Sequence, residues 1–370
     1  MTNFTRHGEQ HIRLFIPGPT EVRPIILDAQ TEWMIGHRMP ECADLFGRIQ
    51  EKVRKVFYTK SRVYVTASSG TGLQEAAVRN CSDKKVLNCV NGAFADRWRK
   101  ITEANGKQNS VLEVDWGKPI LPEQVADCLT NGDFDAVTVV HNETSTGVTS
   151  PIQEIAKAIR SVPGGDEVLI LVDSVSGLSG INLEFDAWDL DVVLTSSQKA
   201  FALPPGLAFC AVSDRALEKA QTIPHRGYYF DFLELEKYLL RNQTPATPAI
   251  SLLYALDRQL DDILSEGMEN RFQRHLDMRD QTISWAQARK LKLFAPAGYR
   301  SPTVTCVVND LGLDINDLNN YLRSQGMIIS NGYGPLKGQN FRIAHMGDTQ
   351  QHDMEKLLET IDRYLAKEQA

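Results

Sequence analysis

Lys199 and Asp173 each stand at the end of an apolar run of the sequence. Lys199 closes the polar segment 195–199, which follows the run 191–194, and Asp173 directly follows the run 168–172. Burial at the rim of a sheet lowers the pKa of a lysine and makes its amine a nucleophile toward carbonyl groups. A carboxylate in such a place can bind a metal, a ribose hydroxyl or a protonated ring nitrogen. The alternatives are a solvated lysine and an aspartate that caps a helix or turn.

The segment Ser69-Gly70-Thr71-Gly72 lies between an apolar run at residues 62–66 and a helical stretch that starts at Leu73. Backbone N–H groups at a helix N-terminus bind phosphate, and glycines let the backbone approach the ligand closely. The segment is not a Walker A loop, because no Gly-Lys-Ser/Thr follows, and Glu75 occupies the third glycine position of a dinucleotide fingerprint. A plain strand-to-helix turn is the alternative.

The combination is more specific than its parts. A phosphate cradle, a strand-end carboxylate and a strand-end lysine are the three contacts that pyridoxal phosphate requires. The cradle would hold the phosphate, Asp173 would keep the pyridine nitrogen protonated, and Lys199 would form the Schiff base. A further polar segment at residues 141–147 follows the run 136–140 and is either part of this site or a polar loop.

The elements that must position these residues alternate between strand and helix. The runs are nearly continuously apolar, as in strands buried on both faces, and helix-length segments such as residues 151–161 separate several of them. This order predicts an α/β domain with a mostly parallel sheet, in which ligands collect at the carboxyl ends of the strands. The predicted strands are residues 62–66, 85–90, 136–140, 168–172 and 191–194.

A long helical pattern at residues 248–290 is expected to bridge this domain and a second one. A strand at 303–308, a helix at 315–325, a strand at 341–344 and a final helix at 351–366 follow. This order predicts a smaller α+β domain from about residue 266.

Composition excludes several classes of protein. The 370 residues include 40 Lys+Arg and 47 Asp+Glu, a net charge of −7, which argues against a nucleic-acid-coating or anionic-membrane protein. No stretch reaches the ~18 consecutive apolar residues of a membrane helix, and the N-terminus lacks a signal-peptide core, so we expect a cytoplasmic protein. Six cysteines without a C-x-x-C pair predict buried reduced thiols and no metal site; they are Cys42, Cys81, Cys89, Cys128, Cys210 and Cys306.

The segments Asp173-Ser174-Val175-Ser176, Ser196-Ser197-Gln198-Lys199-Ala200 and Pro204-Pro205-Gly206 together show a family resemblance. The sequence resembles the class V aminotransferases of the fold-type I pyridoxal phosphate enzymes, most closely the alanine–glyoxylate and serine–glyoxylate (serine–pyruvate) group. The resemblance runs from Pro17 to Ile343. It implies an N-terminal arm at residues 1–16, a large cofactor-binding domain at 17–265 with a mostly parallel sheet, and a small C-terminal α+β domain at 266–370.

The resemblance also implies roles for individual residues. Lys199 matches the Schiff-base lysine, Asp173 the partner of the pyridinium nitrogen, and Arg342 the arginine that binds the substrate α-carboxylate. Phe94 and Val175 match the side chains on the two faces of the ring, and Thr144 a hydroxyl near the ring hydroxyl. The phosphate contacts match Ser69, Gly70, Thr71, Gly72 and Gln198.

In this family the neighbouring subunit completes the phosphate site, which implies a homodimer with shared active sites and places the contacts at Gln243 and Thr244, with Thr247 in reserve. Ala246 stands where other relatives have a threonine, and an alanine cannot donate. His37 and Arg38 are similar to a His-Arg pair that binds a side-chain anion in the phosphoserine branch; a structural pair at a domain interface is the alternative.

The function implied is transamination between a small amino acid, alanine or serine, and a 2-oxo acid, glyoxylate or pyruvate. An anionic donor such as phosphoserine, aminoethylphosphonate or aspartate is the first alternative. A cysteine desulfurase is disfavoured because Ser176 stands where that group has a histidine and no cysteine lies in a Gly/Ser-rich loop. A nucleotide-dependent dehydrogenase lacks its glycine fingerprint, and a non-catalytic scaffold would not need Lys199.

Overall fold

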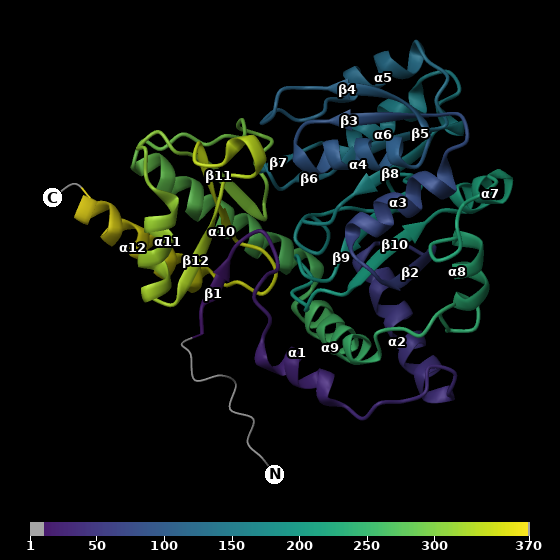
Figure 1. The fold of residues 1–370 in the computed structure, drawn as a ribbon, viewed down its shortest axis with the longest axis horizontal. Helices are drawn as coiled ribbons and strands as arrows, with labels where there is room; N and C mark the ends of the chain where they lie inside the picture. Colours follow the sequence, from purple (N-terminus) through teal and green to yellow (C-terminus); the bar gives the residue numbers. More distant parts are fainter. Residues whose placement is uncertain (1–10, 369–370) are drawn as a thin grey trace.

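The computed structural model describes residues 11–368, and two sheets organise this part of the chain (Figure 1). The large sheet has seven strands in the order β2-β10-β9-β8-β5-β3-β4. Its strands are β2 (Arg62–Ala67), β3 (Lys85–Val90), β4 (Gln108–Glu113), β5 (Ala136–Val140), β8 (Leu169–Asp173), β9 (Val192–Ser196) and β10 (Leu207–Val212). Only β10 runs antiparallel to its neighbours β2 and β9, so the sheet is mostly parallel, as predicted.

Helices join the strands of the large sheet because parallel neighbours need a crossover connection. The helices that make these connections are α3 (Gly70–Cys81), α4 (Ala93–Ala104), α5 (Pro122–Thr130) and α6 (Ile152–Ser161). α2 (Pro40–Val56) precedes the first strand of the sheet, and α7 (Asp214–Thr222) and α8 (Phe232–Leu239) follow its last strand. The short turns are η1 (Ala29–Thr31) and η2 (Gly165–Glu167). The hairpin β6 (Asn142–Glu143) and β7 (Val148–Thr149) follows β5. The central strands β5, β8 and β9 are buried along their whole length, which explains their continuous apolar runs.

The predicted long helix at residues 248–290 consists of two helices instead of one. α9 (Ile250–Glu266) ends at Gly267, and α10 (Met268–Ala288) begins directly after it. Gly267 has a φ of 83°, a left-handed conformation that ends the helical hydrogen-bond ladder. α9 packs in the core of the large sheet and α10 in a second core, so the break lies where the chain passes from one core to the other.

The second core surrounds a four-stranded sheet in the order β1-β12-β13-β11. Its elements are β1 (Arg13–Phe15), β11 (Val304–Val308), α11 (Ile315–Ser324), β12 (Met327–Asn331), η3 (Gly334–Leu336), β13 (Asn340–Ala344) and α12 (Gln351–Glu368). The short helix α1 (Pro24–Asp28) packs against α9, and its Ile26 belongs to the core of the large sheet. In Figure 1 the purple strand β1 lies beside the yellow-green C-terminal strands, and it pairs with β12 in parallel. Residues 11–16 of the predicted arm thus contribute a strand to this sheet, residues 1–10 lie outside the described part, and the boundary at residue 265 stays a prediction.

Candidate active site

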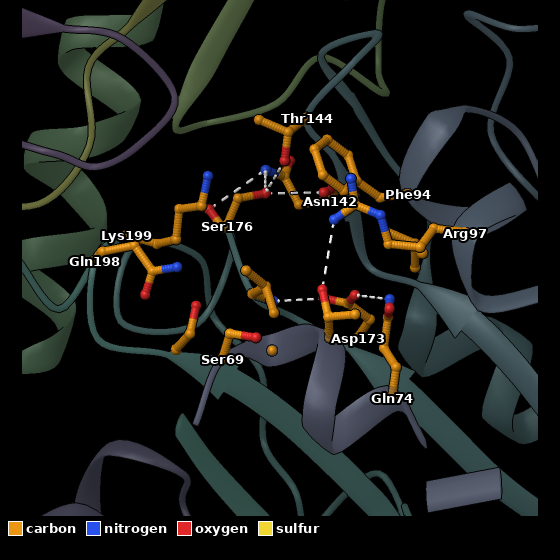
Figure 2. A pocket seen from close by; sticks show the side chains of 15 residues that line it. Ser69, Gln74, Phe94, Arg97, Asn142, Thr144, Asp173, Ser176, Gln198 and Lys199 are labelled. Atoms are coloured by element: carbon orange, nitrogen blue, oxygen red, sulfur yellow. Dashed lines mark hydrogen bonds between the residues drawn. The ribbon is translucent and has the colours of Figure 1, made fainter. Parts of the chain in front are cut away.

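A cavity lies at the carboxyl ends of β5, β8 and β9, where the N-termini of α3 and α4 also point (Figure 2). Its empty volume, open solvent included, is ≈ 590 Å³. The residues that line it are Ser69, Gly70, Thr71, Gln74, Phe94, Arg97, Val140, Asn142, Thr144, Asp173, Val175, Ser176, Ser196, Gln198 and Lys199. The structure thus brings together most of the residues that the sequence singled out.

The first turn of α3 presents unpaired backbone donors to this cavity. The N–H groups of Gly72 and Leu73 donate to the Ser69 carbonyl, whereas those of Gly70 and Thr71 have no partner within residues 11–368. Gly70 is required by packing, because a Cβ there would lie 2.4 Å from Cγ2 of Val175. Unpaired N–H groups at a helix N-terminus form an anion site. Gly72 does not line the cavity.

Asp173 ends β8, and its carboxylate is buried inside the cavity wall. Oδ1 accepts a hydrogen bond from the Val175 N–H at 2.8 Å, and Oδ2 accepts one from Nε2 of Gln74 at 2.6 Å. Burial raises the pKa of Asp173 to about 6 against the opposing effect of these two hydrogen bonds. The group is therefore ionised at neutral pH and can hold a cation or a protonated ring nitrogen.

Lys199 follows β9, and its amine reaches the same cavity. Burial, together with the positive charge of Arg342, lowers the pKa of Lys199 to about 8. The amine donates a hydrogen bond to the carbonyl of Pro17, and Gly18 packs directly against the lysine side chain. A buried amine with this pKa is a nucleophile near neutral pH.

Two aromatic rings and two guanidinium groups pack together on one side of the site, where Phe94 and Arg97 line the cavity. Phe94, at the start of α4, lies 5.3 Å from the ring of Tyr333, measured between centroids. Arg97 stacks on Phe94 at 4.9 Å and donates to the Tyr333 hydroxyl at 3.0 Å. Arg342, on β13, stacks on the ring of Tyr333, 5.5 Å from its centroid, and donates to the Thr144 carbonyl at 3.3 Å. Arg342 is buried next to the cavity without lining it.

A polar network supports the remaining wall. The Thr144 hydroxyl donates to Oγ of Ser176 at 2.7 Å, and Nδ2 of Asn142 donates to the same oxygen at 2.8 Å. Glu143 is fully buried behind them and accepts hydrogen bonds from the N–H groups of Phe94 and Ala95 at 3.1 and 3.0 Å. A carboxylate at a helix N-terminus stabilises the helix and fixes its first residues.

Four of the predicted residues gather elsewhere on the chain. Arg38 donates to the carbonyls of Thr244 and Pro245 at 2.8 and 3.2 Å and approaches Gln243 at 3.4 Å. His37 is half-buried beside it. None of these residues lines the cavity of its own chain.

Sequence reasoning assigned no site role to Gln74, Arg97, Ser176 and Tyr333, and it named Asn142 and Ser196 only as members of the polar segments 141–147 and 195–199. Gln74 and Arg97 each follow a predicted site residue by three positions on the same helix, after Thr71 and Phe94. Residues three apart share one face of a helix, so this spacing could have identified both. Tyr333 comes from the distant turn before η3, and no local signal places it here.

Residues 11–368 contain neither a metal-ligand cluster nor a membrane-spanning helix. No group of three or more His, Cys, Asp or Glu gathers there at metal-ligand distances. None of the helices in this part of the chain is both long and apolar enough to cross a membrane. The six cysteines are unpaired, and Cys128 is the least buried of them.

Comparisons with known proteins agree with this geometry. A family model described as Aminotransferase class-V matches residues 27–338. The chain is 38% identical over 340 residues to an uncharacterized aminotransferase of Methanocaldococcus jannaschii, covering 90% of this chain and 87% of the relative. It is 33% identical over 357 residues to a serine–glyoxylate aminotransferase of Methylorubrum extorquens, covering 93% and 88%. A solved alanine–glyoxylate aminotransferase from Nostoc sp. superposes with a TM-score of 0.91 at 27% identity, covering 97% of each chain.

Proposed function

Since this chain belongs to the class-V, pyridoxal-phosphate-dependent aminotransferases, we propose that it transfers an amino group from alanine or serine to glyoxylate or pyruvate. The family, the cofactor and the fold-type I architecture predicted from the sequence are confirmed by the family match and the structural likeness. The proposed substrates follow the relatives, one of which is named for serine and glyoxylate and the other for alanine and glyoxylate.

One juxtaposition carries the proposal. The Lys199 amine and the Asp173 carboxylate line the same cavity, next to the unpaired N–H groups of Gly70 and Thr71. An amine with a pKa of about 8 can react with a carbonyl group to form a Schiff base, and a buried carboxylate can hold a protonated ring nitrogen. The free donors suit a phosphate. These are the contacts that pyridoxal phosphate needs, so the residues present fit the cofactor.

When bound, the cofactor supplies an electron sink for the electrons released when the substrate Cα loses its proton. Lys199 would be the attachment point; once the substrate amine has displaced it, its neutral Nζ would take that proton and return it, as a general base and acid. Asp173 keeps a proton on the ring nitrogen by its negative charge. Phe94 and Val175 would flank the ring, and the Thr144 hydroxyl and the side chain of Gln198 would contact its polar substituents, since all four residues line the cavity.

Arg342 binds the α-carboxylate of the substrate in this proposal. Its guanidinium is buried and has no carboxylate partner within ion-pair distance in residues 11–368. Nε and one terminal nitrogen donate only to the carbonyls of Asn331 and Thr144, at 3.1 and 3.3 Å. Donors remain for an anion, and the planar fork of a guanidinium suits a carboxylate.

We further propose a homodimer in which each subunit completes the other's site. Gln243 and Thr244 would contact the cofactor phosphate of the partner subunit, and His37 and Arg38 lie beside them through the Arg38 hydrogen bonds. The segment that precedes His37 and Arg38 exposes apolar side chains, with Trp33 90% and Met34 69% exposed. An exposed apolar cluster of this kind is typical of a subunit interface.

Mixing two inactive variants tests the shared sites. The first variant is Lys199→Ala, and the second combines Gln243→Leu with Thr244→Val. A mixed dimer would contain one complete site, so random exchange of subunits should restore about a quarter of the parental activity. A mixture that stays inactive although mixed dimers form would contradict shared sites.

An anionic donor such as aspartate is the second candidate, and Arg97 is the observation that favours it. Its guanidinium lines the cavity and has no acidic partner within residues 11–368. A second unpaired cation beside Arg342 would suit a donor with a second negative group.

A matrix of amino donors and oxo acids decides between these candidates, with cofactor absorbance followed in single half-reactions. We expect alanine or serine to remove the visible absorbance and glyoxylate or pyruvate to restore it. Aspartate reacting faster than alanine, with the preference lost in Arg97→Met, would establish the second candidate. If no amino acid changes the absorbance, or if cysteine yields a persulfide instead, the proposed transamination is wrong.

A further inference from the structure

Gln74 is a buried amide in direct contact with the proposed ring-nitrogen partner. It lies one turn into α3, its side chain is 2% exposed, and Nε2 is 2.6 Å from Oδ2 of Asp173. Figure 2 shows the two side chains meeting across the cavity wall, one from α3 and the other from the end of β8. The Gln74 backbone carbonyl accepts a hydrogen bond from Nε1 of Trp98 at 2.9 Å, which ties this turn of α3 to α4.

The hydrogen bonds of Asp173 favour its ionised form. Each carboxylate oxygen accepts one protein donor, Oδ1 from the Val175 N–H and Oδ2 from Gln74. Lone pairs remain on both oxygens to accept a proton donor from the cavity. Burial and the nearby Glu143 oppose ionisation, whereas Lys199 and the two hydrogen bonds support it. Loss of the Gln74 donor would therefore shift the balance toward a neutral Asp173, which holds a ring proton less well.

The orientation of the Gln74 amide is fixed by this contact. Its Oε1 is buried and has no partner among the described residues, so nothing else in the protein selects the direction of the amide. Rotating the amide by half a turn would place Oε1 against Oδ2, two acceptors in contact. The amide therefore faces Asp173 as a donor while that carboxylate is ionised, and one unsatisfied buried oxygen is the cost.

We infer that Gln74 is a positioning residue that holds the Asp173 carboxylate ionised and directed into the cavity, and so sets how tightly the protonated ring nitrogen of the cofactor is held. The inference rests on the proposed role of Asp173. Gln74 acts through that carboxylate and does not itself contact the reacting atoms.

The test compares Gln74→Leu with Gln74→Glu in the full-length protein. Gln74→Leu keeps the volume and removes the donor. We expect its affinity for pyridoxal phosphate to fall about tenfold or more, the effect of losing a hydrogen bond to a charged group. The pH titration of the cofactor's visible absorbance should shift as well. kcat should fall, while KM for the amino donor should stay near the parental value because Arg342 is untouched.

Gln74→Glu adds a second measurement, the pH dependence of cofactor affinity, which a purely structural role of Gln74 would not change. A protonated Glu donates to Asp173 as the amide does, whereas two ionised carboxylates in contact repel each other. Relative to the parent at the same pH, cofactor affinity should be nearly normal at about pH 5.5 and poor at about pH 8.5. This variant also keeps the inference testable if Gln74→Leu does not fold.

Gln50→Leu is the matched control. Gln50 is also a buried amide, 4% exposed, whose Nε2 donates to a backbone carbonyl at 2.8 Å and whose Oε1 has no partner among residues 11–368, but it lies on α2 outside the cavity. It should lose stability without a change in the absorbance titration. Parental cofactor affinity and titration in Gln74→Leu, or no pH dependence in Gln74→Glu, would overturn the inference. Asp173→Asn distinguishes failure of the Gln74 inference from failure of the proposed function. If this variant binds the cofactor and reacts like the parent, the proposed function itself fails.

Discussion

The side chain of Lys199 lies directly against the backbone of Gly18, so that a Cβ built on Gly18 would lie 2.5 Å from Nζ and 2.7 Å from Cδ. The two residues stand 181 positions apart in the sequence, and the amine also donates to the carbonyl of Pro17. The N-terminal segment thus forms part of the wall that holds the lysine. Space for the amine depends on the absence of a side chain at residue 18.

Gly18→Ala should lower cofactor affinity by about 5- to 150-fold, because overpacking of a filled site costs about 1–3 kcal/mol. Equilibrium titration of the apoprotein with pyridoxal phosphate measures the effect. Gly298→Ala is the control, because both glycines have a positive φ, 118° at Gly18 and 88° at Gly298, but a Cβ added at Gly298 has no atoms within 4 Å. Equal affinity losses in the two variants would attribute the effect to backbone strain and not to contact with Lys199.

The reaction of the apoprotein with the cofactor should follow the titration of Lys199. Its pKa is lowered to about 8, so the amine is protonated and unreactive below that pH and neutral above it. The rate of attachment should therefore rise through about pH 8 and level off, instead of rising through the ordinary lysine range near 10.5. Stopped-flow absorbance across pH 6–11 measures this rate, and a midpoint above about pH 10 would contradict a buried amine.

Arg342→Met should raise KM for the amino donor by about 10- to 100-fold, because a charge-assisted hydrogen bond contributes about 1.5–3 kcal/mol. kcat at saturating donor should change less. The same variant should move the Lys199 titration to higher pH, since Arg342 is the charge that contributes most to lowering that pKa. Steady-state kinetics gives the first result, and Arg300→Met, outside the cavity, serves as control. A KM within twofold of the parent would remove the carboxylate role.

Glu143→Gln should destabilise the protein by about 1–3 kcal/mol, because a buried donor loses its acceptor. The carboxylate accepts from Phe94 and Ala95 on one oxygen and from the Ser145 N–H and hydroxyl on the other. An amide offers a single oxygen, and its NH₂ group would face donors. Urea unfolding gives the free energy of unfolding. Glu103→Gln is the control, because Glu103 is exposed and lies on α4, the helix whose first N–H groups donate to Glu143. Unchanged stability would mean that this cap does not hold α4.

The core of the site follows from local sequence. Asp173, Lys199 and the glycine segment at residues 69–72 each stand where an apolar run ends, and parallel strands place such ends at one edge of a sheet. The structure gathers these residues, except Gly72, around one cavity. The mostly parallel sheet was predictable for the same reason, because strands buried on both faces are continuously apolar.

Other features depend on packing between distant segments. The antiparallel strand β10 enters the sheet between β2 and β9, and β1 joins a sheet made of residues from the far end of the chain. Gly267 divides a helical pattern that is continuous in the sequence. Periodicity reports which face of an element is buried, but not which element covers it.

The sequence by itself determined the chemistry, because the residue types and their strand-end positions are local properties. Only the tertiary structure decided what surrounds that chemistry. Gln74 against Asp173, Gly18 against Lys199, and Tyr333 against Arg97 are contacts across roughly 100 to 240 residues of chain. Such contacts depend on how the two cores and the N-terminal segment pack together, and no local pattern encodes that packing.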